Sequence, residues 1–94
     1  MLTIHNAGGD SVKQASALAL GALGWVLGDQ PRAQRFLDLT GLTPDGLRAA
    51  IGEESTHRAV FEFLLAHEPD LLGAAEALDL PPEQLAAAAR ELAR

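Results

Sequence analysis

The side chains that come closest to a set of metal ligands are His57, Glu62, His67 and Glu68. On one straight helix, the ten positions from His57 to His67 would separate the two rings by about 15 Å, which is too far to share one ion. Isolated polar side chains on a helix are mostly solvated. The sequence therefore predicts no metal site, and it predicts that these histidines are exposed to solvent.

A hydroxyl nucleophile needs a base within hydrogen-bond reach, and Ser55 with His57 is the nearest candidate pair. Positions i and i+2 of a helix point in different directions, so these two side chains do not face each other. The adjacent carboxylates Glu53 and Glu54 stand at an expected helix start, where negative charge favours the helix dipole. No glycine-rich phosphate loop follows a predicted strand. We therefore expect no catalytic residue, no cofactor and no enzymatic activity.

The composition is that of one small acidic domain. The chain has 94 residues, 48% of them apolar, no cysteine and a formal net charge of −6. The absence of cysteine excludes disulfides and thiolate zinc sites. All of the net charge lies in residues 42–94, which hold four basic and ten acidic side chains and form either an acidic docking face or a solvated surface. Nucleic acid and anionic membrane are poor partners for such a domain, so we expect an unidentified protein partner or a second copy.

The uncharged run from Gln14 to Gly28 has some features of a membrane span or a secretory signal. As a helix it would be only about 22 Å long, short of the ~30 Å hydrocarbon core. A secretory signal would also have basic residues ahead of the run, where Asp10 lies. We expect this segment to be part of a mature cytoplasmic protein that does not enter a membrane.

Helix start and stop signals predict an all-α fold. After a flexible lead-in at residues 1–9, the first helix is expected from Asp10 or Ser11 to about Leu27, with Gly28 as a left-handed terminal residue. The later helices are expected at about 29–41, 43–51, 54–66, 69–78 and from 81 onward. These segments predict a compact bundle of five or six helices in one domain, residues 10–94, with the first and fourth helices as its buried pair.

The chain resembles itself when it is shifted by 38 positions, and the matching residues are leucines and prolines near the expected helix ends. They include Leu27 with Leu65, Pro31 with Pro69, Leu42 with Leu80, and Pro44 with Pro82. Two related three-helix halves, about 12–52 and 55–92, would explain the matches, and chance in a leucine- and alanine-rich chain is the alternative. Related halves should be connected by a pseudo-twofold axis or a screw.

The first helix carries a stripe of small residues. Ala17, Gly21, Gly24 and Gly28 fall within a sector of about 60° on a helical projection. Each glycine inside a helix costs about 1 kcal/mol relative to alanine, so a close helix approach should offset that cost. We expect the stripe to pack against the helix that contains Phe61, and homodimerisation through the stripe is the alternative.

Residues 32–51 resemble a helix-turn-helix, with Gly41 in the turn. Leu37 stands where that motif normally has a small residue. The expected second helix offers one cation, Arg48, and no Asn, Gln or Lys that could contact base edges. A DNA-binding regulator therefore remains only an alternative.

Four runs of the sequence carry a family resemblance. They are SALAL at 16–20, FLDLTGLTP at 36–44, VFEFLL at 60–65 and LPPE at 80–83. Together they look like a small uncharacterised bacterial family, a domain of unknown function, over roughly residues 12–92. The resemblance implies a short cytoplasmic helical protein and transfers no catalytic residue.

We expect, on these grounds, a non-enzymatic protein–protein interaction or regulatory module that binds its partner through an apolar groove with an acidic rim. A helix-turn-helix-like DNA-binding regulator is the first alternative. A small enzyme or ligand-binding protein without a recognisable motif is the second.

Overall fold

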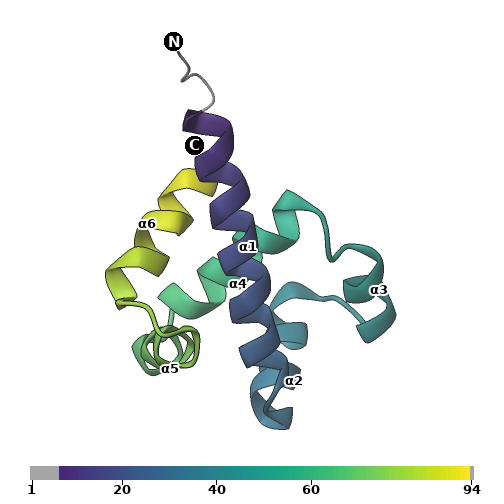
Figure 1. Ribbon diagram of the computed structural model, residues 1–94. Coiled ribbons are helices and arrows are strands. Elements are labelled where there is room, and N and C mark those ends of the chain that lie inside the picture. Colours follow the sequence, from purple (N-terminus) through teal and green to yellow (C-terminus); the bar gives the residue numbers. More distant parts are fainter. Residues whose placement is uncertain (1–6, 94) are drawn as a thin grey trace.

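Six helices make up most of the computed structural model, which describes residues 7–93 (Figure 1). They are α1 (Ala7–Leu27), α2 (Gln30–Thr40), α3 (Pro44–Ala49), α4 (Glu54–Leu65), α5 (Glu68–Leu78) and α6 (Pro82–Ala93). Residues 7–93 contain no strand. The expected all-α bundle is confirmed. In this part of the chain, no helix combines the length and the hydropathy that crossing a membrane requires.

The boundaries of α2 and the start of α3 follow their capping residues. The Asp29 carboxylate accepts a hydrogen bond from the backbone N–H of Arg32 at 3.0 Å. The Thr43 hydroxyl accepts one from the backbone N–H of Gly46 at 2.9 Å. Each bond satisfies an amide that has no partner within its helix. Helix α2 ends at Gly41, which takes the left-handed conformation with φ of 75°.

Two details at the ends of α1 differ from expectation. The helix begins at Ala7, which places Asp10 in its first turn, where a carboxylate favours the helix dipole. The rest of the expected flexible lead-in, residues 1–6, lies outside the described residues. Gly28 is not left-handed: its N–H donates to the Trp25 carbonyl at 3.1 Å, and Asp29 caps the next helix immediately. The left-handed residue that the sequence did not indicate is Asp79, with φ of 58°.

Helix α1 lies at the centre of the bundle and packs against α2, α4, α5 and α6. The core is formed mainly by small residues of α1 and large ones of α4 and α6: Ala15, Ala19, Ala22, Leu23, Val26, Val60, Phe61, Phe63, Leu64, Leu85, Ala88 and Leu92. The expected pairing of the first and fourth helices is present, and α6 packs on both of them. One face of α1 stays exposed, with Leu20 and Leu27 at 41% and 42%.

Helix α3 is set apart from the other five helices at one edge of the molecule (Figure 1). Leu47 is its buried residue. The connection from α3 to α4 is held by His57, whose Nε2 donates to the carbonyl oxygen of Ile51 at 2.9 Å. The carbonyl of Ile51, just beyond the end of α3, thereby gains the partner that the short helix does not supply.

The helix boundaries repeat at the 38-residue spacing found in the sequence. Shifting α2 by 38 residues gives the limits of α5, and the starts of α3 and α6 also differ by 38. The left-handed residues Gly41 and Asp79 stand at equivalent places.

Contacts between the halves are reciprocal. The Trp25 ring packs so closely on α5 that a Cβ atom added to Gly73 would lie 2.5 Å from its Cζ2 atom. At the equivalent positions, Phe63 lies 4.8 Å from the guanidinium carbon of Arg35 on α2. A pseudo-twofold relation between the halves predicts such reciprocal pairs.

Candidate functional site

The residues considered for metal or acid–base chemistry do not come together. No group of three or more His, Cys, Asp or Glu side chains in the described residues is arranged to hold a metal ion. His67 is exposed at the N-cap of α5, as predicted, whereas the prediction for His57 is wrong. His57 is 4% exposed because it turns into the bundle to reach the Ile51 carbonyl, and its Nδ1 atom has no partner. No hydrogen bond joins its ring to Ser55, which is exposed at the start of α4.

The two adjacent glutamates have structural roles at the start of α4. Glu53 occupies the N-cap position without a side-chain capping bond. Glu54 lies in the first turn, and its Oε2 atom is 3.7 Å from the Arg58 guanidinium. Both carboxylates are therefore placed where the helix dipole favours negative charge.

The stripe of small residues on α1 lies on the exposed face of that helix. Ala17, Gly21, Gly24 and Gly28 are all exposed, so the expected packing against α4 is not what the structure shows. A Cβ atom added to Gly21 would lie 3.0 Å from a side-chain carbon of Leu78 on α5, and one added to Gly24 would meet nothing within 4 Å. The alanines on the opposite face of α1 contact the core instead. Homodimerisation through the stripe stays a prediction, which sedimentation equilibrium of a Gly24→Glu variant tests.

The helix-turn-helix alternative depends on α3, which has six residues. Its one cation, Arg48, forms an ion pair with Asp45 of the same helix at 2.6 Å. A recognition helix normally packs against its partner helix and presents several donors to the DNA. Helix α3 buries Leu47, but it makes few other contacts with the bundle, and its one cation is already paired, so it does not present several donors.

An apolar groove lies between α4 and α6. Each helix contributes four residues at the spacing i, i+3, i+4 and i+7, which places them on one face. They are Arg58, Phe61, Glu62 and Leu65 on α4, and Ala86, Ala89, Arg90 and Ala93 on α6. The groove has a volume of about 330 Å³.

The depth of the groove follows from side-chain size. Alanines on α6 leave the space that longer side chains would fill, while Phe61 forms part of the floor and is 2% exposed. Leu65 is 48% exposed at the edge. Helix α6 is held in place by its other face, where Leu85 and Leu92 are buried in the core.

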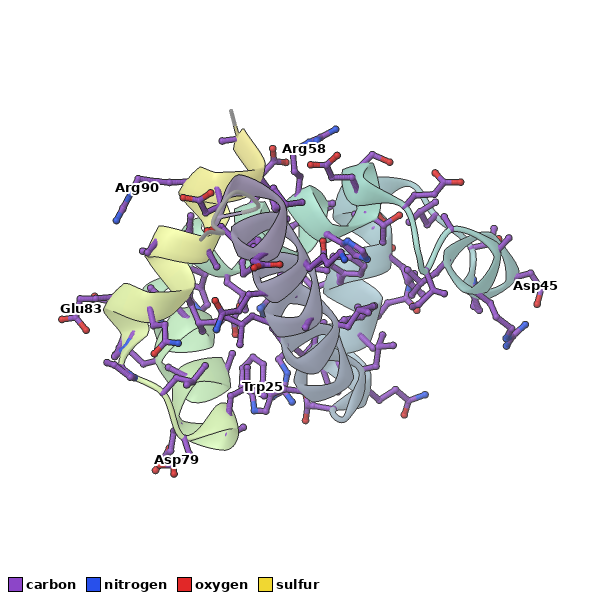
Figure 2. All side chains as sticks on the ribbon, turned by 45° about the horizontal axis from the view of Figure 1, so that its top comes forward. Trp25, Asp45, Arg58, Asp79, Glu83 and Arg90 are labelled. Atoms are coloured by element: carbon purple, nitrogen blue, oxygen red, sulfur yellow. The ribbon has the colours of Figure 1, made fainter. Side chains whose placement is uncertain are left out.

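Two arginines flank this groove. Arg58 forms only the long contact with Glu54, and both side chains are about half exposed. The Arg90 guanidinium makes no ion pair or hydrogen bond with any described residue. Figure 2 shows both arginine side chains extending away from the core, one from α4 and one from α6. Glu62 is the one acidic residue of the lining, so the groove carries a local excess of positive charge in an acidic protein.

A second hollow, on the α2 side of α4, is more polar. Its volume is about 390 Å³, and Leu39 at its edge is 69% exposed. Its lining includes the carboxylates of Glu53 and Glu62 and hydroxyl groups, with no arginine or lysine. These carboxylates lie at the more polar hollow, whereas the apolar α4–α6 groove is flanked by arginines, so the α4–α6 groove does not have the acidic rim that the sequence predicts.

An adjoining hollow contains the ion pair between Arg35 and Asp70, together with His67. The Asp70 carboxylate is bound to the guanidinium, and no hydroxyl or thiol lines this hollow. The imidazole therefore has a carboxylate neighbour but no nucleophile to activate.

The sequence carried a sign of the α4–α6 groove that was not used. The pattern i, i+3, i+4, i+7 is visible at 58–65 and at 86–93, but alanines are common in any helix and do not by themselves indicate a groove. Gly73 was missed as well, because the close approach of Trp25 depends on how α1 and α5 cross.

A family model for proteins of unknown function, DUF3572, matches residues 12–94. The match covers most of the chain and confirms the resemblance seen in the four sequence runs. Neither a curated protein nor a solved structure matches the chain. The chain belongs to the DUF3572 family of proteins of unknown function.

Proposed function

We propose that this protein is a non-enzymatic interaction module that binds a helical segment of a partner protein in the groove between α4 and α6. The observation that carries the proposal is the pair of four-residue stripes that form the two walls of that groove. Two facing rows of side chains, one of them with a low alanine wall, suit the apolar ridge of a third helix, as in other helix-in-groove complexes.

The dimensions of the groove support a helix more than a small ligand. Each wall covers seven helical steps, or about 10 Å, which is two turns of a bound helix. The volume is at the lower end of the range for small-molecule pockets, about 300–1,000 Å³. Leu65 is also half exposed in the free protein, and a partner ridge would cover it.

The enzymatic alternative has little support in the hollows. The polar hollow beside α2 has carboxylates and hydroxyls but no histidine, and the hollow beside Asp70 has a histidine but no hydroxyl. Among residues 7–93, no carboxylate or imidazole that lines these hollows is hydrogen-bonded to a hydroxyl, whereas a general base must lie within hydrogen-bond reach of the proton that it takes. We extend the proposal to a cytoplasmic location, which cell fractionation tests.

Site-directed photocrosslinking tests the proposal directly. Benzoylphenylalanine is introduced at the position of Leu65 in the groove, or at that of Leu72 on α5, and each protein is irradiated in its native cell. The two leucines are matched, because both are 48% exposed and Leu72 lines none of the hollows described above. We expect one reproducible protein adduct from the groove position and none from Leu72. Equal labelling from both positions, or no adduct from either, would contradict an interaction module.

A further inference from the structure

We propose that the α4–α6 groove selects a partner helix that carries acidic side chains beside its apolar ridge. The inference rests on the proposed function and specifies the chemistry of the partner. Its basis is a local reversal of charge: the chain has a net charge of −6, but this groove is lined by two arginines and one glutamate.

The two arginines are available to a partner, unlike Arg32 and Arg35 of α2. Arg32 lies over the Trp25 ring with its guanidinium carbon 3.5 Å from the ring centroid, and Arg35 is paired with the buried Asp70. Arg90 has no partner among residues 7–93. The 3.7 Å contact of Arg58 with Glu54 exceeds hydrogen-bond distance and is open to water, so it is easily exchanged. Two guanidinium groups at the edge of an apolar groove can each bind a carboxylate through two N–H donors.

The apolar ridge of such a helix also fits the apolar residues of the groove. Alanines at i, i+3 and i+7 of α6 let a partner backbone come close, and Phe61 and Leu65 offer apolar contact to its ridge. Carboxylates on the flank of that ridge would then meet the guanidinium groups. Glu62 in the lining and Glu54 beside Arg58 would face such carboxylates unfavourably, so the selectivity depends on direct binding of carboxylates by the two guanidinium groups.

Two model peptides of about 18 residues test this chemistry, a length at which isolated helices become stable. Both carry the same leucine ridge, and one has glutamates on its flanks where the other has lysines. Binding to the whole protein is measured by fluorescence anisotropy in about 0.1 M salt, which screens distant charges beyond roughly 10 Å. The net charge of the protein alone would favour the lysine peptide. We expect the glutamate peptide to bind at least about ten-fold more tightly, a difference of about 1.4 kcal/mol.

Charge reversal in the groove provides the second arm. The double variant Arg58→Glu with Arg90→Glu should reverse the preference. A control with the same change in net charge, Lys13→Glu with Arg48→Glu, alters exposed residues outside the groove and should keep it. Circular dichroism melting curves of both variants verify that each is folded.

Several results would overturn the inference. The first two are equal or tighter binding of the lysine peptide, and a groove variant that behaves like its control. The others are binding of the fatty-acid anion decanoate in place of either peptide, and a dimer in sedimentation equilibrium that the groove variant abolishes. The proposed function is distinguishable from the inference: a partner captured at Leu65 without any dependence on the arginines would leave the interaction module standing and remove only the acidic chemistry.

Discussion

The two halves of the molecule begin alike and finish differently. Helices α2 and α5 have equivalent limits, and α3 and α6 start at equivalent residues. Helix α6 continues for twelve residues and packs on α1, α4 and α5, whereas α3 has six residues and lies apart. The difference is clearest at the third core position of α6, because the residue 38 positions before Leu92 is Glu54, which is exposed and already begins α4. Without that apolar residue a longer α3 would have little to bury, and a helix is stable chiefly through the face it buries.

The hollows of the two halves show what the longer helix adds. The first half has a hollow of about 360 Å³ between α1, α2 and α3. Three of its lining residues, Leu27, Arg48 and Ile51, are equivalent to Leu65, Ala86 and Ala89 of the α4–α6 groove. In the second half α6 extends this wall with Arg90 and Ala93. The length of the groove therefore depends on the length of α6. Variants that alter the core contacts of α6 or of the helices beside it test how α6 is held in place.

The largest effect is expected from replacing the third core residue of α6 by glutamate, the residue type found 38 positions earlier in the chain. Leu92→Glu places a carboxylate at a site that is 1% exposed, so we expect a loss of about 3 kcal/mol or more in the free energy of unfolding. Urea denaturation followed by circular dichroism measures it. The control is Leu72→Glu at a 48% exposed site, which should change stability by less than about 0.5 kcal/mol. A similar cost for both variants would show that α6 is not held by Leu92.

The next effect concerns the reciprocal contacts between the halves. Gly73→Ala would place its Cβ 2.5 Å from the Trp25 ring, and the repacking this forces should cost about 2 kcal/mol. Gly24→Ala, on the exposed face of α1, meets nothing within 4 Å and should raise stability by up to about 1 kcal/mol. Thermal unfolding of the two variants gives shifts of opposite sign. A stabilising Gly73→Ala would refute the close approach of α1 and α5.

A smaller effect on stability is expected from two ion pairs, one that joins the halves and one that lies within α3. Asp70, whose side chain is 10% exposed, pairs with Arg35 between α5 and α2, and Asp70→Asn should cost about 1 kcal/mol because Arg35 is itself nearly half exposed. Asp45 and Arg48 form a pair within α3 whose side chains are 91% and 76% exposed. Asp45→Asn should therefore have an effect close to zero. Equal effects in denaturation would mean that the Asp70 pair does not join the halves.

The sequence predicted local features of this fold better than its packing. Caps such as Asp29, Thr43 and Gly41 act within one turn, so the helix limits around them were predicted correctly. The exposure of the α1 stripe and the burial of His57 depend on which faces meet in three dimensions. Alanine occurs on both faces of α1, and the sequence alone does not show whether its glycines face solvent or another helix. Predicting the groove needs the same three-dimensional information, because its two walls, α4 and α6, are separated in the sequence by α5.

The smallest effect tests whether capping distinguishes the halves. The N-cap of α2, Asp29, makes a side-chain capping bond, whereas its equivalent in α5, His67, makes none although its backbone is also extended, with φ −146° and ψ 101°. His67→Asp should supply that bond, and repulsion from Glu68 in the first turn should limit the gain to about 0.5 kcal/mol. The reverse change, Asp29→His, should cost about 1 kcal/mol. If His67→Asp destabilises the protein in urea denaturation, the two caps are not equivalent, and the similarity of the halves would be limited to their helix boundaries.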